Sequence, residues 1–115
     1  MIKNQTKSFI RIISLMLLII FGFSITAFAL PKASTDFFVA DYANVLKQDT
    51  KNFIQGVNVK YAKEKEKPQI VVLTVNDLEG LDSKIYAVEV FKKWKIGNKD
   101  YDNGILVLLA LDERR

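Results

Sequence analysis

The residues with the clearest potential for chemistry form an acidic loop, Asp100-Tyr101-Asp102-Asn103-Gly104. Hard cations such as Ca²⁺ bind several carboxylate and amide oxygens, and a glycine lets backbone carbonyls join them. Asp100, Asp102 and Asn103 are therefore candidate metal ligands. The loop is not an EF-hand. When the pattern is aligned from Asn98, Gly104 falls at position seven instead of six, and position twelve is Leu109 rather than glutamate.

Two other interpretations apply to the same loop. Asn103-Gly104 is a common turn sequence, and in that interpretation the two acids only keep the turn soluble. The Asp-x-Asp spacing also matches aspartyl-phosphate phosphatases, but their nucleophilic aspartate follows a strand, whereas Asp100 and Asp102 precede one. A metal site and a simple turn both stay open for this loop.

The chain contains no histidine and no cysteine. It therefore cannot by itself build a Ser-His-Asp triad, a Cys-His nucleophile, an HExxH zinc site or a phosphohistidine. We expect no organic cofactor, and any catalysis would fall to carboxylates and a bound divalent cation. Without disulfides, the stability of so small a chain rests on its core.

Residues 1–29 have the pattern of a secretory signal peptide. Basic residues without acids precede an apolar run from Ile12 to Phe21, and Ala27-Phe28-Ala29 fits the small-x-small pattern that signal peptidase recognises. We predict cleavage after Ala29 and an exported, extracytoplasmic chain. The alternative is an uncleaved signal anchor, since the apolar stretch from Ile12 to Leu30 reaches the roughly 20 residues that a membrane span requires.

The net charge of +4 does not indicate nucleic-acid binding. Three of the 17 Lys and Arg residues, and none of the 13 Asp and Glu residues, lie in the predicted signal peptide, so the rest of the chain is nearly neutral. The lysines between positions 60 and 67 alternate with glutamates, which is typical of a solvated helix end. We expect no nucleic-acid partner.

Apolar spacing predicts the order helix, strand, helix, strand. Positions three and four residues apart form an inward stripe in each helix. The first stripe consists of Phe53, Ile54, Val57 and Tyr61, and the second of Ala87, Val90, Phe91 and Trp94. The runs Ile70–Val75 and Ile105–Leu111 predict two buried strands, which the right-handed crossover rule makes parallel. Pro68 and Gly97 mark the helix ends.

Three segments carry a resemblance to a known family: Asp41-Tyr42-Ala43-Asn44-Val45-Leu46, Gln69–Val75 and Trp94–Leu111. Together they resemble the TPM domain, an exported α/β domain of the bacterial envelope and of plastids. The resemblance implies an αβα sandwich and covers residues 37–115, the N-terminal portion of the domain, with residues 30–36 as a flexible lead-in. A further strand, a glycine-rich segment and a helix follow in the family, so we expect a domain that is incomplete at its C-terminus.

The resemblance also bears on the start of the first helix and on Asp41. The family places a capping serine where Lys47 stands here, so Asp49 is the best remaining cap, while Asp82 or Ser83 caps the second helix. The resemblance implies a role for Asp41, in a groove that binds calcium or another divalent ion. The alternative is that Asp41 is a turn or cap residue that accepts backbone N–H groups at Ala43 or Asn44.

Topology separates these candidates. Asp41 falls near the C-terminal edge of the strands, whereas the loop with Asp102 leads into the opposite edge, so we do not expect the two to share one ion. An ion in the crevice at the C-terminal edge of the sheet would be bound by acids that lie near that edge. These acids are Asp41, Asp77, Asp82 and Asp112.

Three functional hypotheses stay open. The first is an exported TPM-domain protein of the cell envelope that acts as a divalent-cation-dependent acid phosphatase, and the second is a non-catalytic envelope binding or assembly module. The third is a non-functional truncated copy. Partners are expected among envelope or membrane proteins, with membrane attachment through a signal anchor or a missing C-terminal segment. A small sheet with an open edge is expected to be marginally stable and to pair with other chains.

Overall fold

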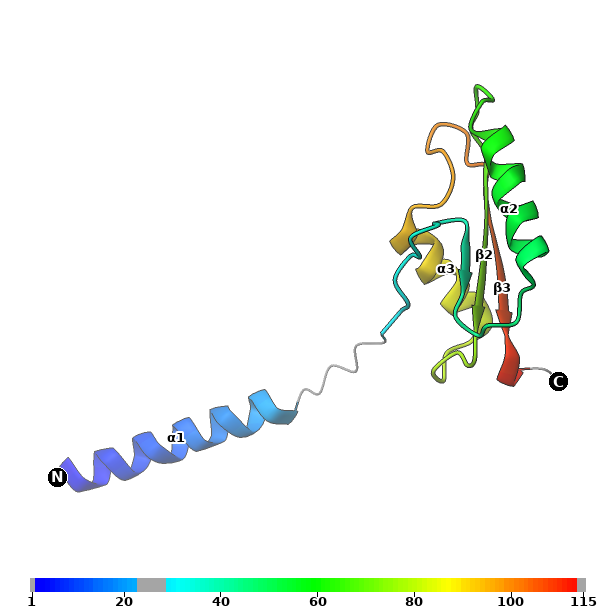
Figure 1. The fold of residues 1–115 in the computed structure, drawn as a ribbon. Coiled ribbons are helices and arrows are strands. Elements are labelled where there is room, and N and C mark those ends of the chain that lie inside the picture. The colour runs from blue at the N-terminus through cyan, green and yellow to red at the C-terminus, as the bar shows by residue number, and fades with distance from the viewer. Residues whose placement is uncertain (1, 23–28, 114–115) are drawn as a thin grey trace.

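The structure is a computed structural model, and it describes residues 2–22 and 29–113. Helix α1 and an αβ unit follow one another along the chain (Figure 1). The elements are α1 (Ile2–Gly22), β1 (Val39–Asp41), α2 (Gln48–Tyr61), β2 (Gln69–Val75), α3 (Ser83–Trp94), β3 (Gly104–Ala110) and the 3₁₀ turn η1 (Leu111–Glu113).

The predicted signal peptide overlaps α1, whose described side chains are exposed. Residues 27 and 28 of its predicted cleavage motif lie outside the described residues. Among the described residues, no helix combines the length and the apolar character that crossing a membrane requires. Cleavage after Ala29 therefore stays a prediction.

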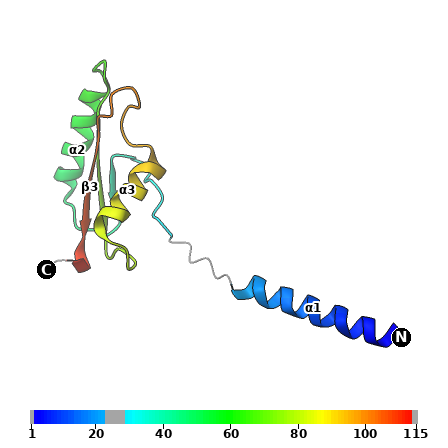
Figure 2. The ribbon, with the colours of Figure 1, turned by 180° about the vertical axis from the view of Figure 1, so that it is seen from behind.

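The three strands form one parallel sheet in the order β1-β2-β3. Ile70 lies opposite Ile105, and Val75 lies opposite Ala110, so the two predicted strands are adjacent and parallel as expected. The third strand, β1, pairs with the other edge of β2 and places Asp41 opposite Thr74. Helix α2 covers one face of the sheet and α3 the other (Figures 1 and 2), which gives three layers.

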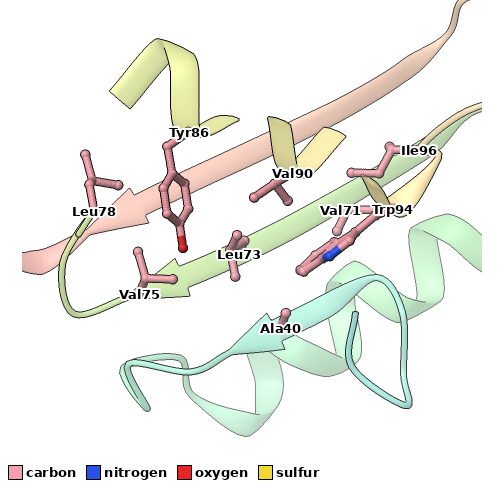
Figure 3. Close-up of a cluster of buried hydrophobic side chains, with 9 residues drawn as sticks. All are labelled: Ala40, Val71, Leu73, Val75, Leu78, Tyr86, Val90, Trp94 and Ile96. Carbon is pink, nitrogen blue, oxygen red and sulfur yellow. The ribbon is translucent and has the colours of Figure 1, made fainter. Parts of the chain in front are cut away.

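The main hydrophobic core lies between β2 and α3. Val71, Leu73 and Val75 point from alternate positions of β2 toward this side, and they are 0 to 7% exposed. They contact a stripe on α3 and residues around it (Figure 3). The cluster is completed by Ala40, Leu78, Tyr86, Val90, Trp94 and Ile96.

The inward stripe of α3 differs from the expected one. Tyr86, Val90 and Trp94 are buried at four-residue steps, whereas Ala87 and Phe91 are only partly buried. The buried stripe therefore includes Tyr86, which the apolar pattern had omitted. A tyrosine ring packs well in a core when its hydroxyl reaches the surface of that core. Asp82 is the helix cap, as predicted, and accepts N–H groups from Lys84 and Ile85.

Helix α2 presents Ile54, Val57 and Asn58 to the other face of the sheet. Phe53 was expected in this stripe but is 72% exposed, because it precedes Ile54 by about 100° of helix rotation. The expected cap Asp49 lies inside the first turn, and Lys47 occupies the N-cap position without a side-chain hydrogen bond.

Strand β3 was expected to be a buried strand, but only one of its faces is covered. Leu106 and Leu108 pack against the core on the α3 side. On the other side Ile105, Val107 and Leu109 are 54, 48 and 37% exposed, because α2 lies over β1 and β2 and does not extend over β3. The strand is therefore an edge with one uncovered apolar face.

Candidate functional site

Asp41 ends β1 with its side chain only 4% exposed. One carboxylate oxygen, Oδ1, accepts hydrogen bonds from Val45 N at 3.0 Å and from Thr74 Oγ1 at 2.6 Å. The other, Oδ2, accepts Leu46 N at 3.0 Å and lies 3.5 Å from Lys51 Nζ. Both oxygens are therefore engaged by the protein itself.

These contacts change the acidity of Asp41. Burial raises the pKa of the carboxyl, but the hydrogen bonds from Thr74, Val45 and Leu46 and the charge of Lys51 lower it by more. The pKa of Asp41 consequently lies below its ordinary value of 3.8. The carboxylate closes the turn between β1 and α2, in the manner of the predicted cap, but it binds N–H groups two residues later than expected.

The acidic loop is positioned by two asparagines. Asn103 Oδ1 accepts Asn98 N at 3.0 Å, and Asn103 Nδ2 donates to Glu66 O at 2.9 Å. Asn98 Nδ2 donates to the same carbonyl at 3.0 Å. These amide groups therefore tie the loop before β3 to the end of the α2–β2 connection.

Asp100 and Asp102 project from that loop and are exposed. Within the described residues, neither carboxylate makes a hydrogen bond or an ion pair. The amide oxygen of Asn103 already accepts a hydrogen bond from Asn98 N. The loop can therefore offer two carboxylates and backbone carbonyls to a cation. Hard cations such as Ca²⁺ accept this donor set when water completes the shell.

The four candidate metal ligands fall into two groups. Asp41 lies at the C-terminal end of β1, and the loop of Asp100, Asp102 and Asn103 enters the N-terminal end of β3. Because the strands are parallel, these places are at opposite edges of the sheet. Nowhere in the described part of the chain do three Asp, Glu, His or Cys side chains come together as a metal-binding group.

A cavity of about 280 Å³ opens at the C-terminal edge of the sheet. Its walls are Ala29, Pro31, Tyr42, Val75, Asn76, Asp77, Glu79 and Tyr86. Of the four acids expected around this edge, only Asp77 lines the cavity, and its Oδ1 accepts Glu79 N at 2.8 Å. Asp41 and Asp82 use their carboxylates as caps.

Sequence reasoning missed the other polar walls of this cavity. Tyr86 is 3% exposed, and burial together with the charges of Glu79 and Asp77 raises the pKa of its hydroxyl. The signal that would have found Glu79 is its place in the loop that leaves β2, because ligands of open parallel sheets gather at this edge. Tyr86 carries no such signal, since a helical tyrosine at core spacing is usually only packed.

Comparison with known proteins agrees with this architecture. The family model described as the TPM domain matches residues 39–115, from the first residue of β1 to the end of the chain. No curated protein matches the sequence. The match spans more than half of the chain and contains the whole parallel sheet, so this chain belongs to the TPM domain family.

Proposed function

We propose that this TPM-domain chain is exported to the cell envelope and acts there as a non-catalytic binding module. Its partner is an extended, uncharged segment of another envelope protein, which adds to the sheet beside β3. The observation that carries the proposal is the exposed apolar face of this edge strand, formed by Ile105, Val107 and Leu109.

In the part of the chain that the structure describes, the free edge of β3 lacks the usual protection against pairing. Natural proteins cover an edge strand or place charges and prolines on it, yet Gly104–Ala110 contains neither a charged residue nor a proline. Adding a strand would pair its remaining backbone groups and remove apolar surface from water. Each of the three half-exposed side chains would then contribute on the order of 1 kcal/mol.

Site-specific photocrosslinking tests this proposal. A benzophenone amino acid replaces Val107 in the full chain, and the same replacement at Val59 serves as the control, because Val59 is similarly exposed but lies on α2. We expect position 107 alone to form a crosslinked product, and mass spectrometry should locate the crosslink in an uncharged extended segment. Equal products at both positions, or none from a folded protein, would reject the proposal.

A second candidate function is a divalent-cation-dependent acid phosphatase, and the open carboxylates of Asp100 and Asp102 favour it. A bound cation would shield the phosphate charge and activate water, while the two asparagine amides hold the loop in place. Hydrolysis of a chromogenic phosphomonoester that stops with a chelator and with Asp102→Ala would support it. Asp36→Ala, another exposed acid, is the control. The absence of turnover in a folded protein supplied with Ca²⁺ or Mg²⁺ would exclude it.

A further inference from the structure

The cavity at the C-terminal edge combines carboxylates with apolar walls. Asp77 and Glu79 supply two acidic groups, and Pro31, Val75 and the ring of Tyr42 supply apolar surface. Its volume of about 280 Å³ is several times the roughly 30 Å³ that one water occupies in the liquid, so it is too wide for a bare ion. These walls suit an ammonium group carried on a short chain.

Tyr86 adds an independent sign of a missing partner. Tyr86 is 3% exposed, and within the described residues its hydroxyl makes no hydrogen bond. No buried polar side-chain atom of these residues lacks a partner, so the hydroxyl oxygen is accessible to solvent, and Tyr86 lines the cavity. Figure 3 shows the hydroxyl directed from α3 toward Val75, which lines the same cavity. Tyr86 itself lines the cavity, so an N–H donor there would give its oxygen the hydrogen bond that the described residues do not supply.

The segment beside this cavity is held by the domain from Leu30 onward. Lys93 Nζ donates to Leu30 O at 3.2 Å, and Trp94 Nε1 donates to Pro31 O at 3.0 Å. The Leu30 side chain also packs against the core, whereas Ala29 is exposed. The first residue that the domain anchors is therefore the residue that predicted cleavage after Ala29 would make N-terminal.

We infer that the cavity is an ammonium-binding site and that its occupant is the α-ammonium group of Leu30 in the processed chain. Ala29 and Pro31 both line the cavity, so the bond that cleavage would break borders the same cavity as Asp77 and Glu79. Processing would place a new positive charge and three N–H donors there. The inference depends on the predicted cleavage, and it is independent of the surface at β3.

Other charges also face Leu30. Glu89 of α3 lines a hollow together with Leu30, while Lys93 brings one positive charge to its carbonyl. Lys32, two residues along the chain, is a second positive charge in this region. Three acids therefore oppose two lysines around the new N-terminus. Opposite charges nearby favour the charged form of an amine, so the site should hold the α-ammonium in its protonated state.

The first test uses the full precursor, expressed in a secreting host, and the product that the host processes. Mass spectrometry should show a chain that begins at Leu30. Isotope-labelled methylation and NMR should then give an α-ammonium pKa about one unit above the ordinary value near 7.7 to 8.0. A chain that starts elsewhere, or an α-ammonium with an ordinary pKa, would overturn the inference.

Two double variants separate the cavity from general charge effects. Asp77→Asn with Glu79→Gln removes both cavity carboxylates, and the asparagine keeps an oxygen for Glu79 N. Asp100→Asn with Asp102→Asn removes the same charge at the opposite edge. We expect only the first pair to return the α-ammonium pKa to its ordinary value. An equal decrease in both would contradict the assignment.

The last arm distinguishes the chain's own ammonium from a free amine. Selective acetylation of the α-amino group should lower the thermal midpoint of the processed chain if Leu30 is the occupant. Methylamine added to the acetylated chain should then restore part of that loss, and it should have no effect on the unmodified processed chain. Acetylation without any effect, or methylamine binding to the unmodified chain, would show that Leu30 does not fill the cavity.

Discussion

The Thr74 hydroxyl joins two strands and a turn, because Oγ1 donates to Asp41 Oδ1 at 2.6 Å and accepts Ala43 N at 3.1 Å. Thr74 and Asp41 are also opposite partners in the register of β1 and β2. Thr74 is completely buried, so both bonds are formed away from water. The turn that follows β1 is thus fixed to the middle of the sheet through one side chain.

Thr74→Val should destabilise the domain by about 2 kcal/mol, because the valine has nearly the same shape but leaves Ala43 N and one bond of Asp41 unsatisfied. Urea unfolding followed by circular dichroism measures the loss. Thr74→Ser keeps the hydroxyl and should retain most of the stability. If the valine and serine variants unfold at the same urea concentration, the hydroxyl does not stabilise this turn.

Asp41 should make the domain sensitive to acid. Its pKa is lower in the folded chain than the ordinary value of 3.8, so the carboxylate stabilises the fold above that pH. This stability is lost as the pH falls below about 4 and through the folded pKa. Asp41→Asn should therefore be less stable near neutral pH and should lose stability less steeply in acid. Urea unfolding midpoints measured between about pH 2 and pH 6 test this. If the midpoint falls equally steeply with pH in the wild type and in Asp41→Asn, this carboxylate does not cause the acid sensitivity.

The two long strands were predictable because their information is local. Ile70–Val75 and Ile105–Leu111 are short apolar runs rich in strand-forming residues, and each is separated from the next by a helical pattern. A helix between two neighbouring strands is the crossover connection that parallel strands need, which favours their parallel arrangement. By contrast, β1 has only three residues, Val39–Asp41, and it exists as a strand because it pairs with β2 far along the chain.

The candidate site was less predictable because it depends on which groups the fold leaves unpaired. The sequence identifies Asp100 and Asp102 by residue type, and the family resemblance implies a role for Asp41. Neither reveals that four protein groups surround the carboxylate of Asp41. The cavity walls Glu79 and Tyr86 lie on a loop and on a helix, which come together only when the chain folds. No local spacing encodes that approach.

Asn58 should be one of the most sensitive polar positions. Its Nδ2 donates to Ile54 O at 2.9 Å and to Ile70 O at 2.8 Å, while its Oδ1 accepts Ile70 N at 2.9 Å. Asn58→Leu leaves the Ile70 groups without this partner inside the protein, so we expect a loss of about 2 to 4 kcal/mol. Asn52→Leu, at an exposed position of the same helix, should cost less than about 0.5 kcal/mol.

Hydrogen exchange provides a second measurement of the Asn58 bridge. The Ile70 amide should exchange slowly in the wild-type chain, since its N–H donates a hydrogen bond to Asn58 Oδ1. It should exchange much faster in Asn58→Leu even under conditions where that variant is folded. Continued protection of this amide in the variant would mean that another group replaces the asparagine oxygen.

Two glycines should respond in opposite directions to the same substitution. Gly97 has a φ of 89°, and a Cβ there would lie 2.5 Å from Gly104 N and 2.6 Å from Gly104 Cα. Both contacts are with backbone, which cannot rotate away, so Gly97→Ala should cost about 2 to 4 kcal/mol. Gly56 lies inside α2 with open space around it, and Gly56→Ala should stabilise the helix by about 0.5 to 1 kcal/mol.

Thermal unfolding of the two alanine variants tests the close packing of the Gly97 turn against the start of β3. Because the added methyl group is the same, its different surroundings must cause any difference between the variants. The double variant should show nearly additive changes, since Gly56 lies on α2 and Gly97 follows α3. A Gly97→Ala chain as stable as the wild type would mean that the loop carrying Asp100 and Asp102 can move away from the strand, and the rigid position assigned to those carboxylates would be wrong.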